Sequence, residues 1–573
     1  MALARRVRAW ARAYPARLGT AASAVALVFA CVSLTPTLIP RGWAVQGALT
    51  GLAAVSGYGV GAVLGWLVRS FDLRDRLAPV RRPVRRVVAV VAPVAVVVSV
   101  VLGARWDQDV RAALTMPASS GWGSWAYVLV PPVAVVVAVP VLAFARWLRG
   151  VSRRLARLVG RVVPASIARA VSVLVVAVLA WGAFSGVIWD GVLSALNASF
   201  AAVNASYDEG VDRPTAAERS GSPDSLESWD HLGREGRRFV TGGPTTAELA
   251  DLEAALPSGT GVPAAEVRQP IRVYAGQEDD VEATAARVVA ELDRTHAWDR
   301  DYLLVVTTTG SGWVDWSMAD TFELLHGGDT AIATMQYSNL PSWLSFIGDR
   351  EHPAHAGLAL FDAVYARWSQ LPADHRPKLE VSGISLGSFG MQAAFSSPHD
   401  VASRTDGALF VGTPSFTPMW STVTDDRDAG TPEVAPVVDG GAQVRFLTGP
   451  PGSTGDPLLL PATWRQPRVV YAQHPSDGVT WWSPETIWDP PDWLSEPRGR
   501  GVVAAIRWFP VVTFEQLTVD LFFAAGADVP MGYGHHFELE YAQGFAALGA
   551  PEGWTAEDTA ALQHVVEQRE PRF

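Results

Sequence analysis

The sequence predicts two successive folds: an α-helical membrane domain, followed by a doubly wound α/β domain built on a mostly parallel sheet. The first rests on about five long apolar runs before residue 204, and the second on strands and helices that alternate after residue 271. With 573 residues, 49% hydrophobic and 18% charged, the chain is too long for one domain and too apolar for disorder. We therefore expect a membrane domain at 1–203, a juxtamembrane connector at 204–270 and the α/β domain at 271–573.

Each apolar run is long enough to cross a hydrocarbon core of about 30 Å as a helix. The first, Leu18 to Ile39, contains no charged residue. The others lie at 43–68, 87–103, 126–145 and 170–189. Val-rich stretches also suit buried strands, but the length and spacing of these runs favour helices. The sequence thus predicts about five transmembrane helices in a multi-pass protein of the cell membrane.

The arginines predict the orientation of these spans. The first 206 residues hold 22 arginines and 5 acidic residues, whereas the remainder holds 24 basic and 52 acidic residues. Arginine-rich segments at 5–17, 69–86 and 146–169 alternate with arginine-poor loops, and such segments remain on the cytoplasmic side. Five spans that start inside end outside, so we expect the acidic α/β domain to be extracytoplasmic and the first span to be an uncleaved anchor.

Composition also excludes several classes of function. The acidic half lacks the Lys/Arg excess that nucleic-acid binding requires. The only cysteine, Cys31, lies in an apolar run, which excludes disulfides, CxxC pairs and thiolate zinc sites. His352 and His355 lack the HExxH spacing and are expected to be structural or on the surface. We predict neither a metal nor any other cofactor.

The second half of the chain shows the alternation of a parallel sheet covered on both faces. The connector before it is rich in Ser, Gly, Pro and acidic residues, and should hold only short helices. Strands are expected at 271–276, 302–310, 330–338, 378–385, 407–414, 443–449 and 468–474. Helices are expected at 280–295, 355–371, 386–397 and 514–525.

The candidate chemistry begins at GISLG, residues 383–387, a GxSxG pattern between an apolar run and a helical stretch. In that context the serine stands on a sharp strand-to-helix turn, and the glycines leave room for the turn. The pentapeptide alone also fits a tight turn with a buried serine. Its placement, and the small residues Ser388 and Gly390 that follow, favour Ser385 as a nucleophile.

A serine hydroxyl needs a base to accept its proton and a carboxylate to orient that base. His535 and His536 share a Gly-rich loop after the last expected strand; only one can be the base, and we favour His535. Asp477 follows the strand at 468–474, at the edge where such a sheet delivers functional residues, and is the favoured acid. The rivals are three other loop aspartates: Asp439, Asp456 and Asp528.

Acyl transfer also needs amide donors for the developing oxyanion. Leu386, directly after the serine, supplies the first. The second is expected from Gly310, Ser311 or Gly312, in a glycine-rich loop after an early strand. This loop also fits a simple turn; a phosphate-binding loop is disfavoured, since neither GK[ST] nor GxGxxG is present there.

Several long stretches carry a resemblance to a known family. They are GWVD at 312–315, HGGDTAIATMQYSNLPSWLS at 326–345, SLGSFG at 385–390, QHPSD at 473–477 and GYGHHF at 532–537. On these residues the chain resembles the bacterial integral-membrane α/β-hydrolase family common in actinobacteria, whose members join a multi-span N-terminal domain to a C-terminal hydrolase domain. The resemblance covers nearly the whole chain and implies a serine hydrolase without a cofactor; the order Ser, Asp, His is that of the α/β-hydrolase fold. Ile384 replaces the acidic residue of the family's GESLG, and Tyr533 replaces a histidine.

Together these features predict a membrane-anchored serine hydrolase, esterase- or lipase-like, that cleaves an acyl ester through an acyl-enzyme. Its expected partners are the lipid bilayer and an acylated or lipid-like small-molecule substrate of the membrane or envelope. The apolar segment LPSWLSFI, residues 340–347, fits either core packing or a rim that admits lipid.

Three other functions compete with this one. An acyltransferase uses the same triad with an alcohol in place of water. A binding module keeps the fold without the chemistry. Transport is disfavoured, because the spans show no obvious internal repeat or midplane charge pair.

Overall fold

The structure is a computed structural model that describes residues 20–71, 74–119, 122–161, 199–259, 261–278, 280–449 and 463–569, with a few single positions at 171–178 and 460. The chain divides into two compact units. The first comprises residues 1–191 with 484–494 and 502–520, and the second comprises 192–483, 495–501 and 521–573.

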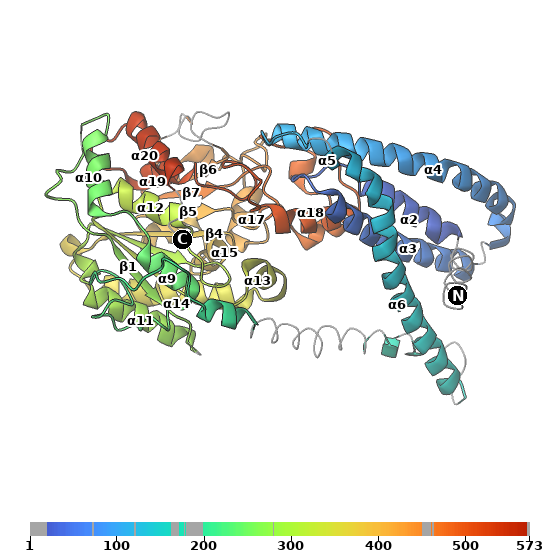
Figure 1. The fold of residues 1–573 in the computed structure, drawn as a ribbon, viewed down its shortest axis with the longest axis horizontal. Helices are drawn as coiled ribbons and strands as arrows, with labels where there is room; N and C mark the ends of the chain where they lie inside the picture. The colour runs from blue at the N-terminus through green and yellow to red at the C-terminus, as the bar shows by residue number, and fades with distance from the viewer. Residues whose placement is uncertain are drawn as a thin grey trace. The chain divides into compact units, whose positions relative to one another are not determined.

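The first unit is helical. Its α-helices are α2 (Thr20–Val32), α3 (Trp43–Ser70), α4 (Arg74–Ala113), α5 (Trp122–Trp125), α6 (Val130–Val159) and most of α18 (Val512–Phe523) (Figure 1). Three segments, at Trp43–Val68, Ala89–Ala113 and Ala126–Val159, are long and apolar enough to cross a membrane. The three therefore fit membrane association.

The prediction of about five spans is wrong in number for the described residues, of which three such segments are found. The first expected span, Leu18 to Ile39, forms only a short apolar helix at Ala21–Val32, because the chain turns at Ser33 and Leu34 instead of continuing. Pro36 lacks the backbone N–H that a continuing helix would use. The fifth expected span, at 170–189, lies almost entirely outside the described residues.

Helices of the first unit meet at small residues and present large ones outward. A Cβ on Gly57 of α3 would lie 2.7 Å from the Phe29 ring of α2, and one on Gly51 would lie 2.7 Å from the Ala134 carbonyl oxygen of α6. Small residues of this kind let helices approach closely in lipid. Several large apolar side chains are exposed along α4 and α6: Val90, Val94, Val97, Val136, Phe144 and Trp147. An exposed apolar surface of this kind is typical of contact with a membrane.

Helix α18, from late in the sequence, forms hydrogen bonds with the segment that follows α2. In α18, the Gln516 amide donates to the carbonyl oxygen of Thr35 at 3.0 Å. The Asp520 carboxylate accepts from the Thr37 hydroxyl at 3.0 Å and from the Leu38 amide at 3.1 Å. These bonds satisfy polar groups just after α2 that apolar surroundings would leave unpaired.

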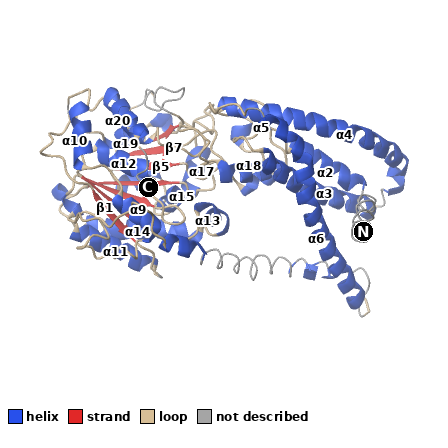
Figure 2. Cartoon of the chain, viewed as in Figure 1, coloured by secondary structure: helices blue, strands red, loops and turns tan. Residues whose placement is uncertain are grey.

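The second unit is built on a seven-stranded sheet in the order β1-β3-β2-β4-β5-β7-β6, and all of its pairings are parallel. The strands are β1 (Ile271–Ala275), β2 (Tyr302–Thr307), β3 (Thr330–Met335), β4 (Lys378–Ile384), β5 (Gly407–Val411), β6 (Val444–Leu447) and β7 (Arg468–Ala472). Nearly every strand residue is buried, as expected when helices cover both faces. The predicted parallel sheet is confirmed, and β4 is its central strand. Figure 2 shows the strands of this sheet in red.

Helices cover the sheet in two layers (Figure 1). One layer contains α11 (Val281–Arg294), α14 (Glu351–Trp368) and α15 (Leu386–Gln392), and the other contains α12 (Trp316–Leu325), α19 (Tyr541–Gly549) and α20 (Ala556–Gln568). The remaining α-helices of this unit are α9 (Gly233–Thr241), α10 (Thr246–Ala255), α13 (Ser342–Gly348), α16 (Pro398–Arg404) and α17 (Pro418–Asp425). The parallel connections bring the carboxyl ends of the strands, and the loops after them, to one edge.

A buried ion cluster fastens the layer of α12 to the edge strand β1. The Arg272 guanidinium donates to Asp320 and to both carboxylate oxygens of Glu323, each at 2.7 Å. It also donates to the Phe239 carbonyl oxygen of α9 at 2.9 Å. Arg272 is 1% exposed and Glu323 is fully buried, so each charge depends on the others for its stabilisation.

We expect Arg272→Ala to lower the free energy of unfolding by about 3–5 kcal/mol, because it leaves the buried Glu323 carboxylate without its counter-ion, while Asp320 keeps its ion pair with Arg569. Urea unfolding of the detergent-solubilised chain, followed by tryptophan fluorescence, measures this loss. The control is Arg268→Ala, whose ion pair with Asp329 is half exposed and should contribute about 1 kcal/mol or less. Equal losses in the two variants would contradict the role assigned to the cluster.

Candidate active site

Ser385 occupies a strained turn between β4 and α15. Its backbone has φ 57° and ψ −124°, a conformation that residues other than glycine rarely adopt. The turn is held by two backbone bonds: the Ser385 amide donates to the Val411 carbonyl oxygen at 2.9 Å, and its carbonyl accepts from the Phe389 amide at 3.1 Å. Such strain persists only where the surrounding structure enforces it, and it is concentrated at functional sites.

Two glycines make this turn sterically possible. A Cβ on Gly383 would lie 2.5 Å from the carbonyl group of Gly387, across the turn. A Cβ on Gly387 would collide with the carbonyl oxygen of Thr307, at the end of β2. Both clashes are with backbone atoms, which cannot move aside, so the GxSxG glycines are required by close approach of three chain segments.

The structure brings Asp477 and His535 together. His535 Nδ1 lies 2.7 Å from Asp477 Oδ2, and the Asp477 side chain is fully buried. The carboxylate also accepts from the Val479 amide at 2.8 Å and the Thr480 hydroxyl at 2.9 Å. Because an ionised carboxylate only accepts, His535 carries its proton on Nδ1, which leaves Nε2 as an acceptor.

His535 and the serine turn lie at the same edge of the sheet. The His535 ring packs against Gly412, the residue after Val411, whose carbonyl binds the Ser385 amide. His535 Nε2 is buried and makes no hydrogen bond with any described residue, Ser385 included. Hydrogen bonds of this kind are often long in structures without substrate. His535 therefore contacts Asp477 through Nδ1, and its Nε2 remains without a hydrogen-bond partner among the described residues.

The rival residues lie elsewhere. His536 points its Nδ1 toward Glu538 and its Nε2 toward the Gly526 carbonyl oxygen, each at 3.2 Å. Burial lowers the pKa of His536, but Glu538 and that carbonyl outweigh burial and raise it, which does not suit a general base. Asp439 and Asp528 are exposed, and Asp456 falls in a segment for which no structure is described.

The backbone amides that are candidates to donate to an oxyanion differ in whether they are already hydrogen-bonded. Leu386 is the first residue of α15, so its amide has no acceptor within that helix. In the loop after β2, the Gly312 amide is already bound to the Thr309 carbonyl oxygen at 2.8 Å. This leaves the amides of Gly310 and Ser311 as candidates there, with Gly310 at φ 28°.

A second buried histidine, to which the sequence analysis gave no role, braces the loop that carries His535. His474 Nδ1 lies 3.0 Å from the Gly534 carbonyl oxygen, and its Nε2 lies 2.9 Å from a Glu540 carboxylate oxygen. Both partners are acceptors, so both ring nitrogens must donate and His474 is an imidazolium. Burial lowers the pKa of His474, but Glu540 and the Gly534 carbonyl outweigh burial and raise it. The only sequence signal was its place in QHPSD, three residues before Asp477.

Aromatic side chains gather one helical turn from the serine. Phe389 of α15 packs edge-to-face on Phe416, with ring centroids 5.5 Å apart, and Phe416 packs on Phe346 of α13 at 4.9 Å. Phe389 and Phe416 are partly exposed. In the segment 340–347 the core interpretation fits Phe346, which is 2% exposed, whereas Trp343 is 41% exposed. The surroundings of Ser385 on this side are aromatic, and the Arg350 guanidinium lies 3.8 Å from the centre of the Phe416 ring.

No group of metal-ligating residues is found where the chain is described. His352 and His355 are exposed on α14 and pair with Asp349 and Glu282, each at 2.7 Å.

A parallel sheet whose central strand ends in a serine turn defines the class of α/β hydrolase folds. The match to known families agrees: a model described as "Alpha/beta-hydrolase family" covers residues 271–562, and one described as "Alpha/beta-hydrolase family N-terminus" covers residues 34–244. The first alone covers more than half of the chain. The chain therefore belongs to the alpha/beta-hydrolase family.

Similarity to individual proteins is weak. No curated protein matches the chain. Among solved structures, an acetylxylan esterase at 0.90 Å resolution is similar over 31% of this chain and 84% of its own, with 15% identity and a TM-score of 0.20. Values this low carry no argument about function.

We expect His474→Gln to destabilise the second unit more at pH 6 than at pH 9. The pKa of His474 is raised in the folded chain. The stability from its charge is therefore complete below the unfolded value of about 6.5 and is lost as the pH rises through the folded value. Urea unfolding at both pH values measures the difference, expected to be roughly 1–3 kcal/mol at pH 6. His375→Gln, at an exposed histidine, is the control. A loss that does not change with pH would contradict a charged His474.

Proposed function

We propose that the protein is a membrane-anchored serine hydrolase that cleaves an acyl ester through an acyl-enzyme. Ser385 is the nucleophile, His535 the general base and Asp477 the residue that orients it. The observation that carries this proposal is the 2.7 Å contact between Asp477 and His535 at the edge where the strained Ser385 turn stands. A buried acid, an oriented imidazole with a free nitrogen, and a serine on a strand-to-helix turn are the parts that acyl transfer needs.

The reaction follows from the free nitrogen of His535. Nε2 accepts the Ser385 proton as the serine oxygen attacks the ester carbonyl, and Asp477 stabilises the imidazolium that forms. The Leu386 amide, with that of Gly310 or Ser311, donates to the oxyanion. His535 then returns the proton to the leaving alcohol, and a water molecule, activated by the same nitrogen, releases the acid. An alcohol in place of water would make the same site an acyltransferase.

The surroundings of the serine support an acylated or lipid-like substrate. Phe389 and Phe416 offer partly exposed aromatic surface one turn from Ser385. An acyl chain gains free energy when it leaves water for such a surface. The three apolar helices of the first unit fit a substrate that is met at a membrane.

We expect a fluorophosphonate to label Ser385 covalently and Ser385→Ala to abolish both labelling and ester hydrolysis. His535→Gln should reduce kcat by about 10⁴–10⁶ and Asp477→Asn by about 10⁴, because each removes part of one proton-transfer unit. Mass spectrometry of the labelled peptide and hydrolysis of p-nitrophenyl esters of graded chain length measure these effects.

Matched variants control for nonspecific damage. Ser403→Ala, His536→Gln and Asp528→Asn alter the same residue types outside the proposed triad and should keep most of the activity. Unchanged labelling in Ser385→Ala, or loss in His536→Gln equal to that in His535→Gln, would overturn the assignment.

We also propose that the α/β-hydrolase unit is extracytoplasmic, because the arginine-rich segment at 146–169 should remain in the cytoplasm and the apolar run at 170–189 after it is long enough to cross the membrane once more. A membrane-impermeant fluorophosphonate should then label Ser385 in intact cells as strongly as in lysed cells. Labelling that appears only after lysis would place the unit in the cytoplasm. Labelling by a permeant fluorophosphonate in both samples is the control for reagent activity.

A further inference from the structure

The second unit contains a polar pocket that the proposed reaction does not use. Its volume is about 420 Å³, within the range of small-molecule sites, and it lies at the carboxyl ends of β1 and β3. Its walls come from the loop after β1, the start of α11 and the segment after β3. Its lining includes Gln277, Glu278, Val281, Gln336, Tyr337 and Asn339.

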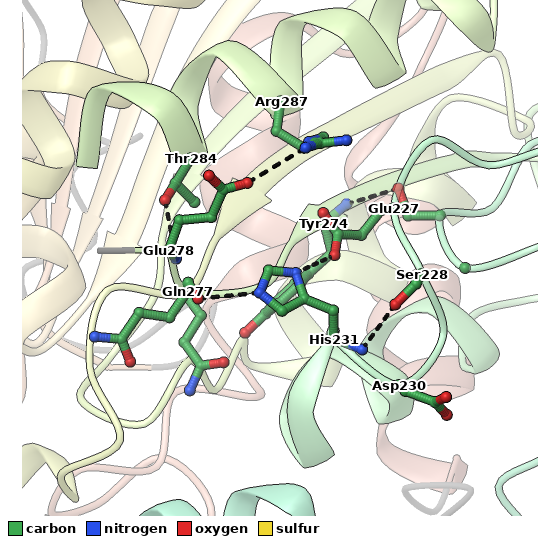
Figure 3. Close-up of polar contacts among 12 residues, drawn as sticks. Glu227, Ser228, Asp230, His231, Tyr274, Gln277, Glu278, Thr284 and Arg287 are labelled. Atoms are coloured by element: carbon green, nitrogen blue, oxygen red, sulfur yellow. Dashed lines mark hydrogen bonds and ion pairs between the residues drawn. The ribbon is translucent and has the colours of Figure 1, made fainter. Parts of the chain in front are cut away.

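One wall of the pocket is held rigidly by the segment before α9. His231 Nδ1 lies 2.5 Å from Glu227, and its Nε2 lies 3.2 Å from the Gln277 carbonyl oxygen (Figure 3). The next residue, Glu278, has its amide bound to the Thr284 hydroxyl at 3.3 Å. The backbone of this loop is therefore bonded on two sides, by His231 and by Thr284.

The side-chain amides at the pocket are linked by a series of hydrogen bonds. The Asn204 amide nitrogen donates to Gln336 at 3.3 Å and to Asn339 at 3.0 Å. Asn339 in turn donates to the Gln277 side-chain oxygen at 3.0 Å. Each donor is thus matched with an acceptor, which fixes the orientation of all these amides. At the end of the chain, the Gln277 NH₂ group has no partner within the described residues.

Tyr337 contributes to the wall of the pocket but not a polar group that a ligand can reach. The residue is 4% exposed, and its hydroxyl is buried near the backbone of Gly310. The polar groups that the pocket offers are therefore the Gln277 amide as a donor and the Glu278 carboxylate as an acceptor.

The charges of the lining select the class of ligand. No lysine or arginine lines the pocket, and its one histidine, His352, is paired with Asp349 at 2.7 Å, which disfavours phosphate and carboxylate ligands. The carboxylate of the lining, Glu278, lies 3.5 Å from the Arg287 guanidinium, so a cation would find little net negative charge. Hydroxyl groups both donate and accept, and they match a lining of amide and carboxylate groups. We propose that this pocket binds a neutral, hydroxyl-rich group such as a sugar or another polyol.

The pocket shares hydrogen bonds with the proposed oxyanion loop. Gln336 donates to the Ser311 carbonyl oxygen at 3.1 Å, and Thr308 donates to the Met335 carbonyl oxygen at 2.9 Å. This loop does not line the pocket, but it binds Gln336 and Met335 of the lining and begins directly after Thr307, the last residue of β2, whose carbonyl oxygen lies close to Gly387 of the serine turn. A hydroxyl-rich group held there is the alcohol part of the ester, and this second step rests on the proposed function.

Calorimetric titration of the full-length chain tests the pocket directly. The protein is purified in lauryldimethylamine oxide, a detergent without a sugar, as wild type and as Ser385→Ala. The compounds are methyl glucoside, methyl galactoside, methyl mannoside, methyl arabinoside, myo-inositol and glycerol, with inorganic phosphate and tetramethylammonium as charged alternatives. We expect at least one neutral compound to bind both proteins with the same Kd.

Variants locate the binding. Gln277→Ala removes one hydrogen bond at an exposed position and should weaken Kd by about three- to tenfold. Val281→Trp should abolish binding by filling the space, while Gln370→Ala, at an exposed glutamine outside the pocket, should leave Kd unchanged. Thermal melting checks that each variant is folded.

The outcomes separate the two proposals. The pocket assignment is overturned if no neutral compound binds, if Gln277→Ala and Val281→Trp both bind as the wild type does, or if phosphate or tetramethylammonium binds more tightly. If Ser385 resists the fluorophosphonate while a sugar still binds, only the hydrolase proposal falls. If Ser385 is labelled and no neutral compound binds, only the pocket proposal falls.

Discussion

The close approach of three backbone segments at Gly383 and Gly387 is the constraint on which the rest of the candidate site depends. It forces the chain from β4 into α15 through a positive φ at Ser385 and leaves no room for any side chain at either glycine. The parallel sheet makes this approach possible, since β2, β4 and β5 all end at the same edge. The Ser385 turn follows β4 and Asp477 follows β7, whereas His535 stands on a loop after α18, so only packing at that edge brings the three together.

The regions on the two sides of the Ser385 turn differ in polarity. Phe389 and Phe416 make one side aromatic, and the amide-rich pocket beyond β2 makes another side polar. Both sides are fixed by packing and hydrogen bonds that do not need a ligand. A substrate with an acyl chain and a hydroxyl-rich alcohol would be oriented by this difference before any bond is broken, because misplacing either part would cost desolvation.

Buried charged groups stabilise two parts of the second unit. Arg272 ties the edge strand β1 to α12 and α9, and the His474 imidazolium ties the loop of Asp477 to the loop of His535. Neither arrangement was predictable from sequence, because each joins residues dozens of positions apart, and each residue alone looks like an ordinary polar group of a strand or loop. The Asp520 contacts in the first unit are of the same kind, linking a late helix to the segment after α2.

The amino-acid sequence alone predicted the two kinds of fold and all seven strands, and it offered Ser385, Asp477 and His535 as candidates, because hydrophobic periodicity and turn chemistry are local properties of the chain. Local patterns could not count the spans, since a run of apolar residues does not show where Pro36 ends a helix. Nor could they separate Gly312, whose amide is already bound, from Gly310 and Ser311. Only the tertiary structure decided which nitrogen of His535 is free, which amides are available and where polar groups close a pocket. These are properties of contacts between distant segments, and the geometry of such contacts is set by packing and not by spacing along the chain.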